Sequence, residues 1–256
     1  MKKRYLESAK VYRKYSRVKR MMSRRSWLWC VVLLLMTGKS YGQLFDESYP
    51  SLDDYRSVGL GASAQNFYAA GGNTLSDSAR IRITNPLWSV EYRQMGLRVA
   101  FGYSPYKFNN ENRSEISLAA ESITDIGIAS ASDHANFFLP IVFSTNFVQA
   151  SGATNSTRDF NIANVGIGTG LKFEQVSENF GFQITGVGVL YYSTAGFSVE
   201  SGSSTSGLVE LQFLFRGLIG EGMTAGYRFE AQSWSMSDKS QNYTRLIQGP
   251  FIGIFF

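Results

Sequence analysis

Ionisable side chains occur at every second position in several strongly apolar segments of this chain. Between residues 208 and 232, for example, Glu210 alternates with Leu211, and Arg228 with Phe229. Charges shielded from water need partners, so such a set could form a self-neutralising network, line a polar conduit or hold a small ligand. Five basic and four acidic groups nearly balance, which favours the network and argues against strong ion selectivity. The set is Glu91, Arg93, Arg98, Lys172, Glu174, Glu210, Arg216, Arg228 and Glu230.

His134 is the only histidine of the chain and follows Asp133 directly. A histidine held by an acid can activate a serine for hydrolysis. No nucleophile-elbow motif accompanies this pair, so we expect no catalysis. The sequence also lacks clustered metal ligands and phosphate-binding loops, and we therefore expect neither a metal nor a cofactor.

The elements that carry the charges have a period of two, which is the period of a β-strand. One face of each segment is aromatic or aliphatic, and the other holds Gly, Ser, Asn, Gln and the charges. The predicted strands are 87–94, 96–106, 136–148, 162–174, 180–193, 207–219, 223–236 and 243–256. The apolar face is represented by Trp88, Tyr92, Phe101, Phe143, Phe173, Leu211, Phe213, Phe215, Tyr227 and Phe229.

The composition of the two faces discriminates between fold classes. A soluble sandwich buries its apolar face and exposes a polar one, whereas a membrane barrel turns the apolar face to lipid and the polar face to its lumen. The scarcity of Lys and Glu on the polar face favours the barrel. A soluble β-barrel or sandwich remains the alternative.

Connections between the predicted strands alternate in length. Residues 176–179 and 220–222 are tight turns, whereas 150–159, 195–206 and 235–243 are longer and rich in Ser. Short turns at one rim and long loops at the other are typical of outer-membrane barrels. The tight turn at 94–96 predicts a register in which Glu91 faces Arg98. The turn at 220–222 predicts that residue 214 faces 228, 212 faces 230 and 210 faces 232.

The basic charge of the chain is confined to its N-terminus. Residues 1–42 contain twelve Lys or Arg and one acid, which leaves thirteen basic and nineteen acidic residues in the remainder. The remainder is therefore acidic, and we exclude nucleic acid as a partner. Ten apolar residues at 27–36, followed by Ser40 and Gly42, predict a signal peptide over 1–42. Translation could start at Met1, Met21 or Met22, and Cys30, the only cysteine, lies in the apolar run.

Signal peptide, alternation, unequal connections and the C-terminal Phe256 together resemble a small bacterial outer-membrane β-barrel protein over residues 86–256. The resemblance implies an all-β, antiparallel transmembrane barrel, with Phe256 as the signal read by the barrel-assembly machinery. Phe251 occupies the glycine position usual before the terminal aromatic residue. Pro250 is unusual in a strand because proline cannot donate a hydrogen bond to the ladder.

Two segments leave the strand count open between about eight and ten. Residues 43–85 are polar and rich in glycine, which fits a periplasmic lead-in, a plug or an additional strand. Residues 107–135 fit an amphipathic helix or another hairpin. Counting back from a periplasmic C-terminus, eight strands place this long segment at the periplasmic rim, where long connections are unusual. Two further strands within 43–130 would remove the mismatch.

We therefore expect a non-enzymatic barrel of the bacterial outer membrane. Its role would be structural, or binding and assembly through its loops and N-terminal segment. Its partners would be outer-membrane lipid, the barrel-assembly machinery and other envelope proteins. The alternative is a channel or uptake protein for a small or apolar solute.

Overall fold

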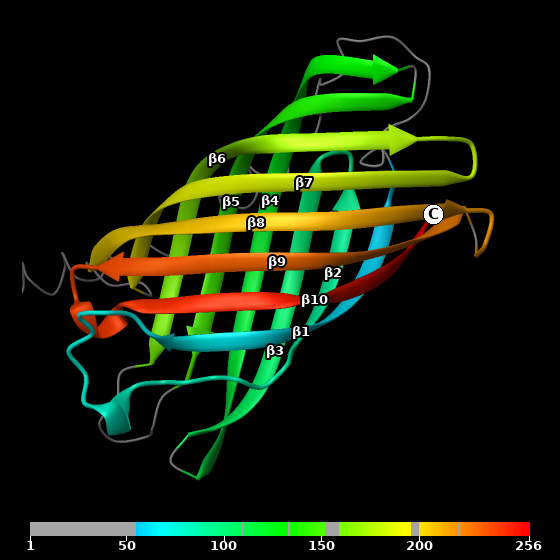
Figure 1. The fold of residues 1–256 in the computed structure, drawn as a ribbon. Helices are drawn as coiled ribbons and strands as arrows, with labels where there is room; N and C mark the ends of the chain where they lie inside the picture. The colour runs from blue at the N-terminus through cyan, green and yellow to red at the C-terminus, as the bar shows by residue number, and fades with distance from the viewer. Residues whose placement is uncertain (1–54, 109, 133, 152–158, 196–199, 220) are drawn as a thin grey trace, which may run out of the picture. The chain divides into compact units, whose positions relative to one another are not determined.

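Ten antiparallel strands of the computed structural model close into a barrel (Figure 1). The structure describes residues 55–108, 110–132, 134–151, 159–195, 200–219 and 221–256, so the predicted signal peptide and Cys30 lie outside it. Each strand pairs with its sequence neighbours, and the first pairs with the last. The strands are β1 (Ser57–Ala69), β2 (Leu87–Gln94), β3 (Leu97–Phe108), β4 (Glu111–Ser132), β5 (Ala135–Ala150), β6 (Phe160–Val176), β7 (Phe180–Ala195), β8 (Ser201–Arg216), β9 (Gly222–Met236) and β10 (Tyr243–Phe255).

The strand count is ten rather than about eight. The two additional strands, β1 and β4, lie in the two segments whose structure the sequence left open. They place a barrel strand before residue 86 and fill 111–132 with one long strand. In the described part of the chain the helices are two short 3-10 turns, η2 (Asp77–Ala79) and η3 (Lys239–Gln241). None of the helices there is long and apolar enough to cross a membrane.

The two rims of the barrel differ in the length of their connections. At one rim β2 is followed by β3, β4 by β5, β6 by β7 and β8 by β9, and the ends of β1 and β10 are paired there. At the other rim β1 is followed by β2, β3 by β4, β5 by β6, β7 by β8 and β9 by β10, and the described connections 70–86 and 237–242 lie there. We call these the short-turn rim and the long-loop rim. With ten strands, residues 111–132 form β4 rather than a long connection at the rim of the C-terminus, which removes the topological mismatch.

Turn geometry sets registers that differ from those expected. Met95 and Gly96 both have positive φ (44° and 74°), as a two-residue hairpin turn requires. Arg98 consequently pairs with Arg93 rather than with Glu91. The β8–β9 turn begins at Gly217 (φ 74°) and extends to 221, so it is longer than the predicted 220–222. In the observed register Glu210 faces Arg228, Gln212 faces Gly226 and Leu208 faces Glu230.

Burial alternates along most of β7, β9 and β10, as expected when one face lines the lumen and the other faces outward. In β9, for example, Gln232 is buried, whereas Tyr227 and Phe229 are exposed. The outward faces expose large apolar side chains on all ten strands. This outer apolar band includes Leu60, Trp88, Phe101, Leu118, Phe143, Val165, Ile167, Leu171, Leu190, Tyr192, Val209, Tyr227, Phe229 and Ile252.

A row of phenylalanine rings crosses the outer surface of β5, β6, β7 and β8 near the short-turn rim. Phe137 contacts Phe173 with ring centroids 4.9 Å apart, and Phe182 contacts Phe213 at 5.5 Å. Phe173 and Phe182 are 6.2 Å apart, which makes the row continuous. Aromatic girdles of this kind flank the apolar band of outer-membrane barrels.

Candidate functional site

The predicted lumenal charges line the interior, although the sequence did not identify all their partners. Glu91, Arg98, Lys172, Glu174 and Glu210 are buried, and the others except Arg216 take part in the same internal ion pairs. Arg216 lies at the short-turn rim, where its guanidinium is 5.3 Å from the ring centre of Tyr55. The interior also contains Glu115, Glu121, Asp125 and Arg245, which the sequence analysis missed.

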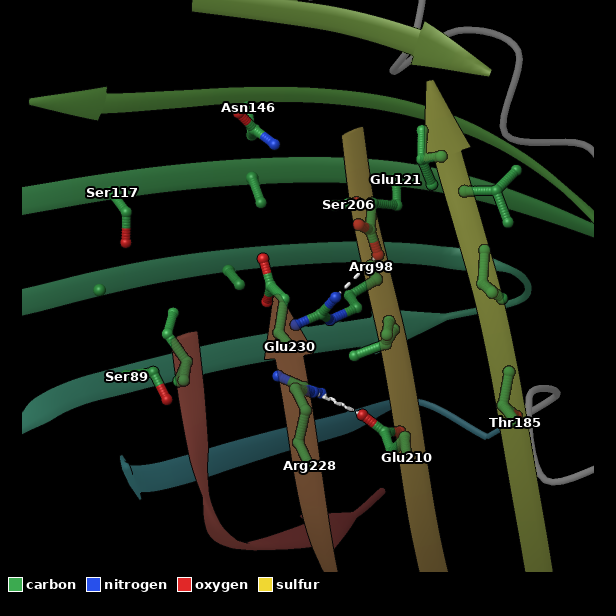
Figure 2. A pocket seen from close by; sticks show the side chains of 18 of the residues that line it. Ser89, Arg98, Ser117, Glu121, Asn146, Thr185, Ser206, Glu210, Arg228 and Glu230 are labelled. Atoms are coloured by element: carbon green, nitrogen blue, oxygen red, sulfur yellow. Dashed lines mark hydrogen bonds and ion pairs between the residues drawn. The ribbon is translucent and has the colours of Figure 1, made fainter. Parts of the chain in front are cut away.

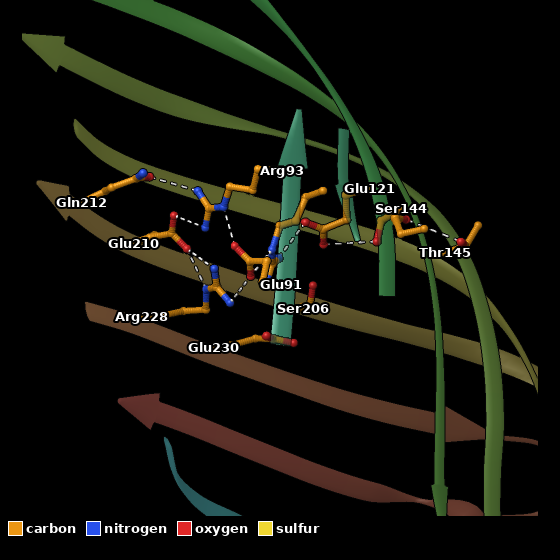
Figure 3. A network of polar contacts seen from close by, with 12 residues as sticks. Glu91, Arg93, Glu121, Ser144, Thr145, Ser206, Glu210, Gln212, Arg228 and Glu230 are labelled. Carbon is orange, nitrogen blue, oxygen red and sulfur yellow. Dashed lines mark hydrogen bonds and ion pairs between the residues drawn. The ribbon is translucent and has the colours of Figure 1, made fainter. Parts of the chain in front are cut away.

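The central cluster is organised around Glu91, a carboxylate of β2 (Figure 3). One of its oxygens lies 2.8 Å from Arg98 Nε and 2.8 Å from Arg228 Nη1. The other oxygen accepts a hydrogen bond from Arg93 Nε. Three guanidinium groups therefore share one buried carboxylate, and each must have a further acceptor.

Those further acceptors come from strands on both sides of the barrel. Arg98 Nη1 lies 2.8 Å from Glu121 on β4. Arg93 Nη2 lies 2.6 Å from Glu210 on β8, and Arg228 Nε donates to the same carboxylate at 2.7 Å. Three acids and three bases thus form a network that spans the lumen. Buried ion pairs are sustained where each charge has such compensation.

The ring of Phe251 packs against two arginines of this cluster. This contact accounts for a phenylalanine at the position before the terminal aromatic residue that is usually a glycine. The guanidinium carbons of Arg93 and Arg228 lie 5.5 and 5.3 Å from the centre of its ring. The facing residue on β9 is Gly226, and a Cβ there would overlap the ring and the carbonyl oxygen of Leu211. Glycine at this position therefore makes room for an aromatic side chain that stabilises two cations.

Two smaller clusters carry the remaining charges. Lys172 Nζ lies 2.6 Å from Asp125 and 3.2 Å from Glu174, so one cation serves two carboxylates. Arg245 does the same for the carboxylates of β4 and β9. Its Nη1 lies 3.0 Å from Glu115, and its Nη2 lies 3.7 Å from Glu230.

An apolar cluster closes the lumen near the long-loop rim, and we call it the outer cap. Phe67, Phe160 and Tyr243 pack with ring centroids 4.9–5.1 Å apart, and Trp234 lies 5.0 Å from Phe160. The long connection 70–86 contributes to it as well: Ile83 exchanges two 2.9 Å backbone hydrogen bonds with Phe67. The other members are Ile81, Tyr106, Phe108, Val148, Ala150, Ile162 and Met236.

A smaller apolar cluster lies near the short-turn rim. Val176, Leu214 and Phe255 are buried there, and Tyr55 packs against Phe255 with ring centroids 5.4 Å apart. Together with the outer cap and the central ion pairs, this cluster places buried side chains at three levels between the two rims.

A cavity of about 120 Å³ lies inside the barrel, and residues of the central cluster such as Arg98, Glu210 and Arg228 line part of it (Figure 2). A water molecule needs roughly 10–15 Å³ of such space, so several waters or one small molecule would fit. Its wall is mixed. The apolar residues of the wall are Leu87, Ile123, Val142, Val187, Val189, Leu208 and Ile247. The charged residues include Arg98, Glu121, Lys172, Glu210, Arg228 and Glu230.

His134 lies at the short-turn rim, outside this cavity. Its side chain is exposed, its backbone N–H donates to Ser132 Oγ at 3.4 Å, and its carbonyl accepts from Val176 at 2.9 Å. The neighbouring Asp133 lies outside the described residues. Among the described residues, no three acids, histidines or cysteines are grouped so that they could hold a metal ion.

Comparison with known proteins gives resemblance at the level of a class. No protein-family model matches the chain, and no curated protein sequence matches it. Among solved structures, Neisserial surface protein A has 15% identity and a TM-score of 0.31 over 81% of this chain and 100% of that one. The outer membrane protease OmpT from Escherichia coli has 7% identity and a TM-score of 0.32 over 82% and 99%. Ail, the attachment invasion locus protein of Yersinia pestis, has 10% identity and a TM-score of 0.21 over 78% and 99%.

The first of these is a surface protein, the second an outer membrane protease and the third an attachment invasion locus protein by name. The similarity is too low to transfer a role.

Proposed function

We propose that the chain is a non-enzymatic β-barrel of the bacterial outer membrane whose lumen is packed and self-neutralised. The observation that carries the proposal is the pairing of a continuous outer apolar band with an interior full of ion pairs. Soluble monomers rarely expose contiguous apolar patches larger than a few hundred Å². Lipid would cover the outer apolar band, and the buried charges would face one another in the lumen.

The orientation follows from the rims. In bacterial barrels the short turns face the periplasm and the longer loops face outward. The start of β1, which pairs with the end of β10, and the row of phenylalanine rings lie at the short-turn rim. The outer cap and the 70–86 connection would then face the exterior, and binding or assembly would use the long-loop rim and the segment before β1. The proposed partners are outer-membrane lipid, the barrel-assembly machinery, which would recognise Phe256, and other envelope proteins.

Uptake of a small or apolar solute is the second candidate. It is favoured by one observation, the internal cavity that the central cluster partly lines. A hydrolase that uses His134 has less support, because this residue lies at the periplasmic rim of the proposed orientation.

Membrane fractionation followed by electrophoresis with and without boiling tests the location and the fold. We expect the protein in the outer-membrane fraction, with a mobility that changes on boiling because the folded barrel resists detergent. Recovery from the soluble periplasm, with one mobility in both conditions, would overturn the proposal.

A further inference from the structure

Two interruptions of strand pairing divide the barrel into sequence-contiguous halves. Pairing between β1 and β10 lapses at residues 62–63 opposite 249–250, and pairing between β5 and β6 lapses at 139–140 opposite 170–171. Each interruption contains a proline. Pro250 of β10 stays paired with β9, and Pro140 of β5 stays paired with β4. A proline cannot donate to the ladder, which gives each interruption its cause. In the barrel order the two seams lie opposite each other, with β1–β5 on one side and β6–β10 on the other.

The β5–β6 seam is closed by side chains on both faces. Outside, the rings of Phe137 and Phe173 meet across it at 4.9 Å. Inside, Lys172 on β6 lies 5.1 Å from the ring centre of Phe138 on β5 and pairs with Asp125 on β4. These contacts hold the two halves together where backbone pairing is missing.

The centre of the β1–β10 seam has only small residues on the β1 side. Gly61, Ala62, Ser63 and Ala64 face a β10 segment that contains Gly249 and Pro250. The backbones approach closely, because a Cβ on Gly249 would lie 2.5 Å from the Ala62 carbonyl oxygen. The wall of the barrel is therefore thin here, and its main-chain ladder is incomplete.

Contacts above and below confine this weakness to the middle of the seam. Toward the long-loop rim, Phe67 and Tyr243 stack across the two strands with centroids 4.9 Å apart. Toward the short-turn rim, Tyr55 packs on Phe255 at 5.4 Å, and Phe256 donates a 3.1 Å backbone hydrogen bond to Arg56. Both ends of the seam are thus joined by ring contacts, whereas its centre contains the interrupted part of the ladder.

The internal cavity lies directly behind this thin wall. Ser63 and Ile247, from the two strands of the seam, line it, as do Leu87 and Ser89 from the adjacent β2. Ser89 is close to the seam itself, because a Cβ on Gly61 would lie 2.5 Å from its hydroxyl oxygen. Beyond the seam, the outer surface carries Leu60, Trp88 and Ile252, which belong to the apolar band.

We propose that residues 61–64 of β1 and 248–250 of β10 form a lateral window between the cavity and the surrounding lipid. Opening separates the strands in the middle of the seam, where one proline already removes a ladder hydrogen bond. A slender, mainly apolar molecule passes through the window from the membrane. This inference rests on the proposed membrane location.

The cavity favours an apolar chain that carries a basic head group. Its apolar wall suits the chain, and Glu230 supplies a carboxylate at the charged part of the wall. The cation nearest to Glu230 is Arg245, at 3.7 Å, which lies closer to Glu115 at 3.0 Å. A positively charged or hydrogen-bond-donating head placed beside Glu230 would complete the pairing of this carboxylate, whereas a carboxylate head in the same place would add a second negative charge.

A single lumenal cysteine tests the window in the full chain carrying Cys30→Ser, reconstituted into lipid vesicles. The reporter is Ser89→Cys, and the two reagents are N-dodecylmaleimide, which partitions into the membrane, and a sulfonated, membrane-impermeant maleimide. We expect the reporter to react with the alkyl reagent and to resist the sulfonated one. Faster reaction with the sulfonated reagent would overturn the window, because it would place the route through the ends of the barrel.

A disulfide across the window provides the second variant. Ala64 and Gln248 are paired and face outward, so Ala64→Cys with Gln248→Cys should join the strands when oxidised. We expect alkyl labelling of the reporter to fall by about tenfold, which corresponds to an opening made costlier by ~1.4 kcal/mol, and to recover after reduction. The matched control joins the opposite seam through Phe143→Cys and Ile167→Cys, also paired and outward, and should leave labelling unchanged. Unchanged labelling after oxidation at the window would contradict the proposal.

Restoring the backbone N–H that Pro250 lacks is a test that changes the seam less than a disulfide does. Pro250→Val should slow alkyl labelling by roughly two- to tenfold, the effect of one added backbone hydrogen bond on the open state. Pro140→Val, at the opposite seam, should not change it. Equal effects of the two substitutions would show that proline affects the barrel in general and would overturn the assignment of the window to β1–β10.

Competition against labelling tests the head group. Dodecylamine should protect the reporter better than dodecanoate, and Glu230→Gln should abolish this difference. Equal protection by the two compounds would overturn the basic head. In each of these experiments, a change of electrophoretic mobility on boiling identifies the folded barrels. A variant that has lost its fold can therefore be distinguished from a folded variant whose labelling contradicts the window.

Discussion

Glu210 on β8 and Arg228 on β9 face each other directly, and Arg228 Nε donates a 2.7 Å hydrogen bond to the carboxylate. The same carboxylate lies 2.6 Å from Arg93 on β2. The hairpin pair is thereby connected to a strand that is distant in both sequence and barrel order. Charges that would be costly singly in a membrane protein are compensated as a group.

Neutralising Glu91 should destabilise the barrel more than any exposed charge change. Glu91→Gln leaves three guanidinium groups around a neutral amide, and removal of one partner from a buried network costs about 3–5 kcal/mol. Urea unfolding in detergent micelles, followed by the mobility change on boiling, measures this loss. Asp77→Asn is the control, because the Asp77–Arg80 pair is exposed and should contribute little. Equal midpoints for Glu91→Gln and wild type would contradict the central role of Glu91.

Adding one methyl group to Gly226 should disturb the same cluster through packing. The new Cβ overlaps the Phe251 ring, on which two guanidinium groups lie. Overpacking of this kind costs about 1–3 kcal/mol, so Gly226→Ala should lower the urea midpoint. Gly207→Ala is the matched control, since a Cβ there has no atom within 4 Å. The explanation fails if the two variants unfold alike.

Much of the strand pattern could be predicted because the contrast between the faces is strong where large residues alternate with polar ones. In β9 the alternation of Tyr227 and Phe229 with Arg228 and Glu230 identifies the strand and both of its faces. In β1 the contrast is weak, because small residues such as Gly59, Gly61 and Ser63 line the inward face. In β4, long sequence runs of Ala, Ser, Ile and Glu suit a helix as well as a strand.

The missing partners could not be predicted for a different reason. Glu115 and Arg245 are separated by 130 residues and meet only because the barrel closes. Their pairing depends on strand count and on turn geometry, and neither was fixed by local pattern. The turn at Gly217 illustrates the second point: beginning the turn three residues before the expected 220 changed which charges face each other in β8 and β9.

The connection 70–86 should be held in the barrel by its isoleucines. Ile83 is fully buried in the outer cap and is paired with Phe67, so Ile83→Asp should release the connection by burying a charge without a partner. Trypsin added to intact cells should then cleave after Arg80 or Arg82, whereas wild type should resist. Thr74→Asp, at an exposed position in the same connection, should also resist. Resistance of Ile83→Asp would argue against this anchoring or against an outward-facing loop.

Replacement of His134 should leave the purified protein unchanged in any hydrolytic assay. We expect wild type and His134→Ala to act on nitrophenyl esters and on peptides at the same background rate, because His134 is exposed at the short-turn rim and does not line the internal cavity. Unchanged mobility on boiling verifies the fold of the variant. A wild-type rate that falls on substitution would restore the hydrolase alternative.

Conductance across planar lipid bilayers tests the central claim most directly, namely that the lumen is packed by an outer cap and a self-neutralising ion network. The folded, heat-modifiable barrel should insert without producing stable conductance steps. Well-defined, long-lived steps from the same preparation would contradict a closed lumen and would favour a pore.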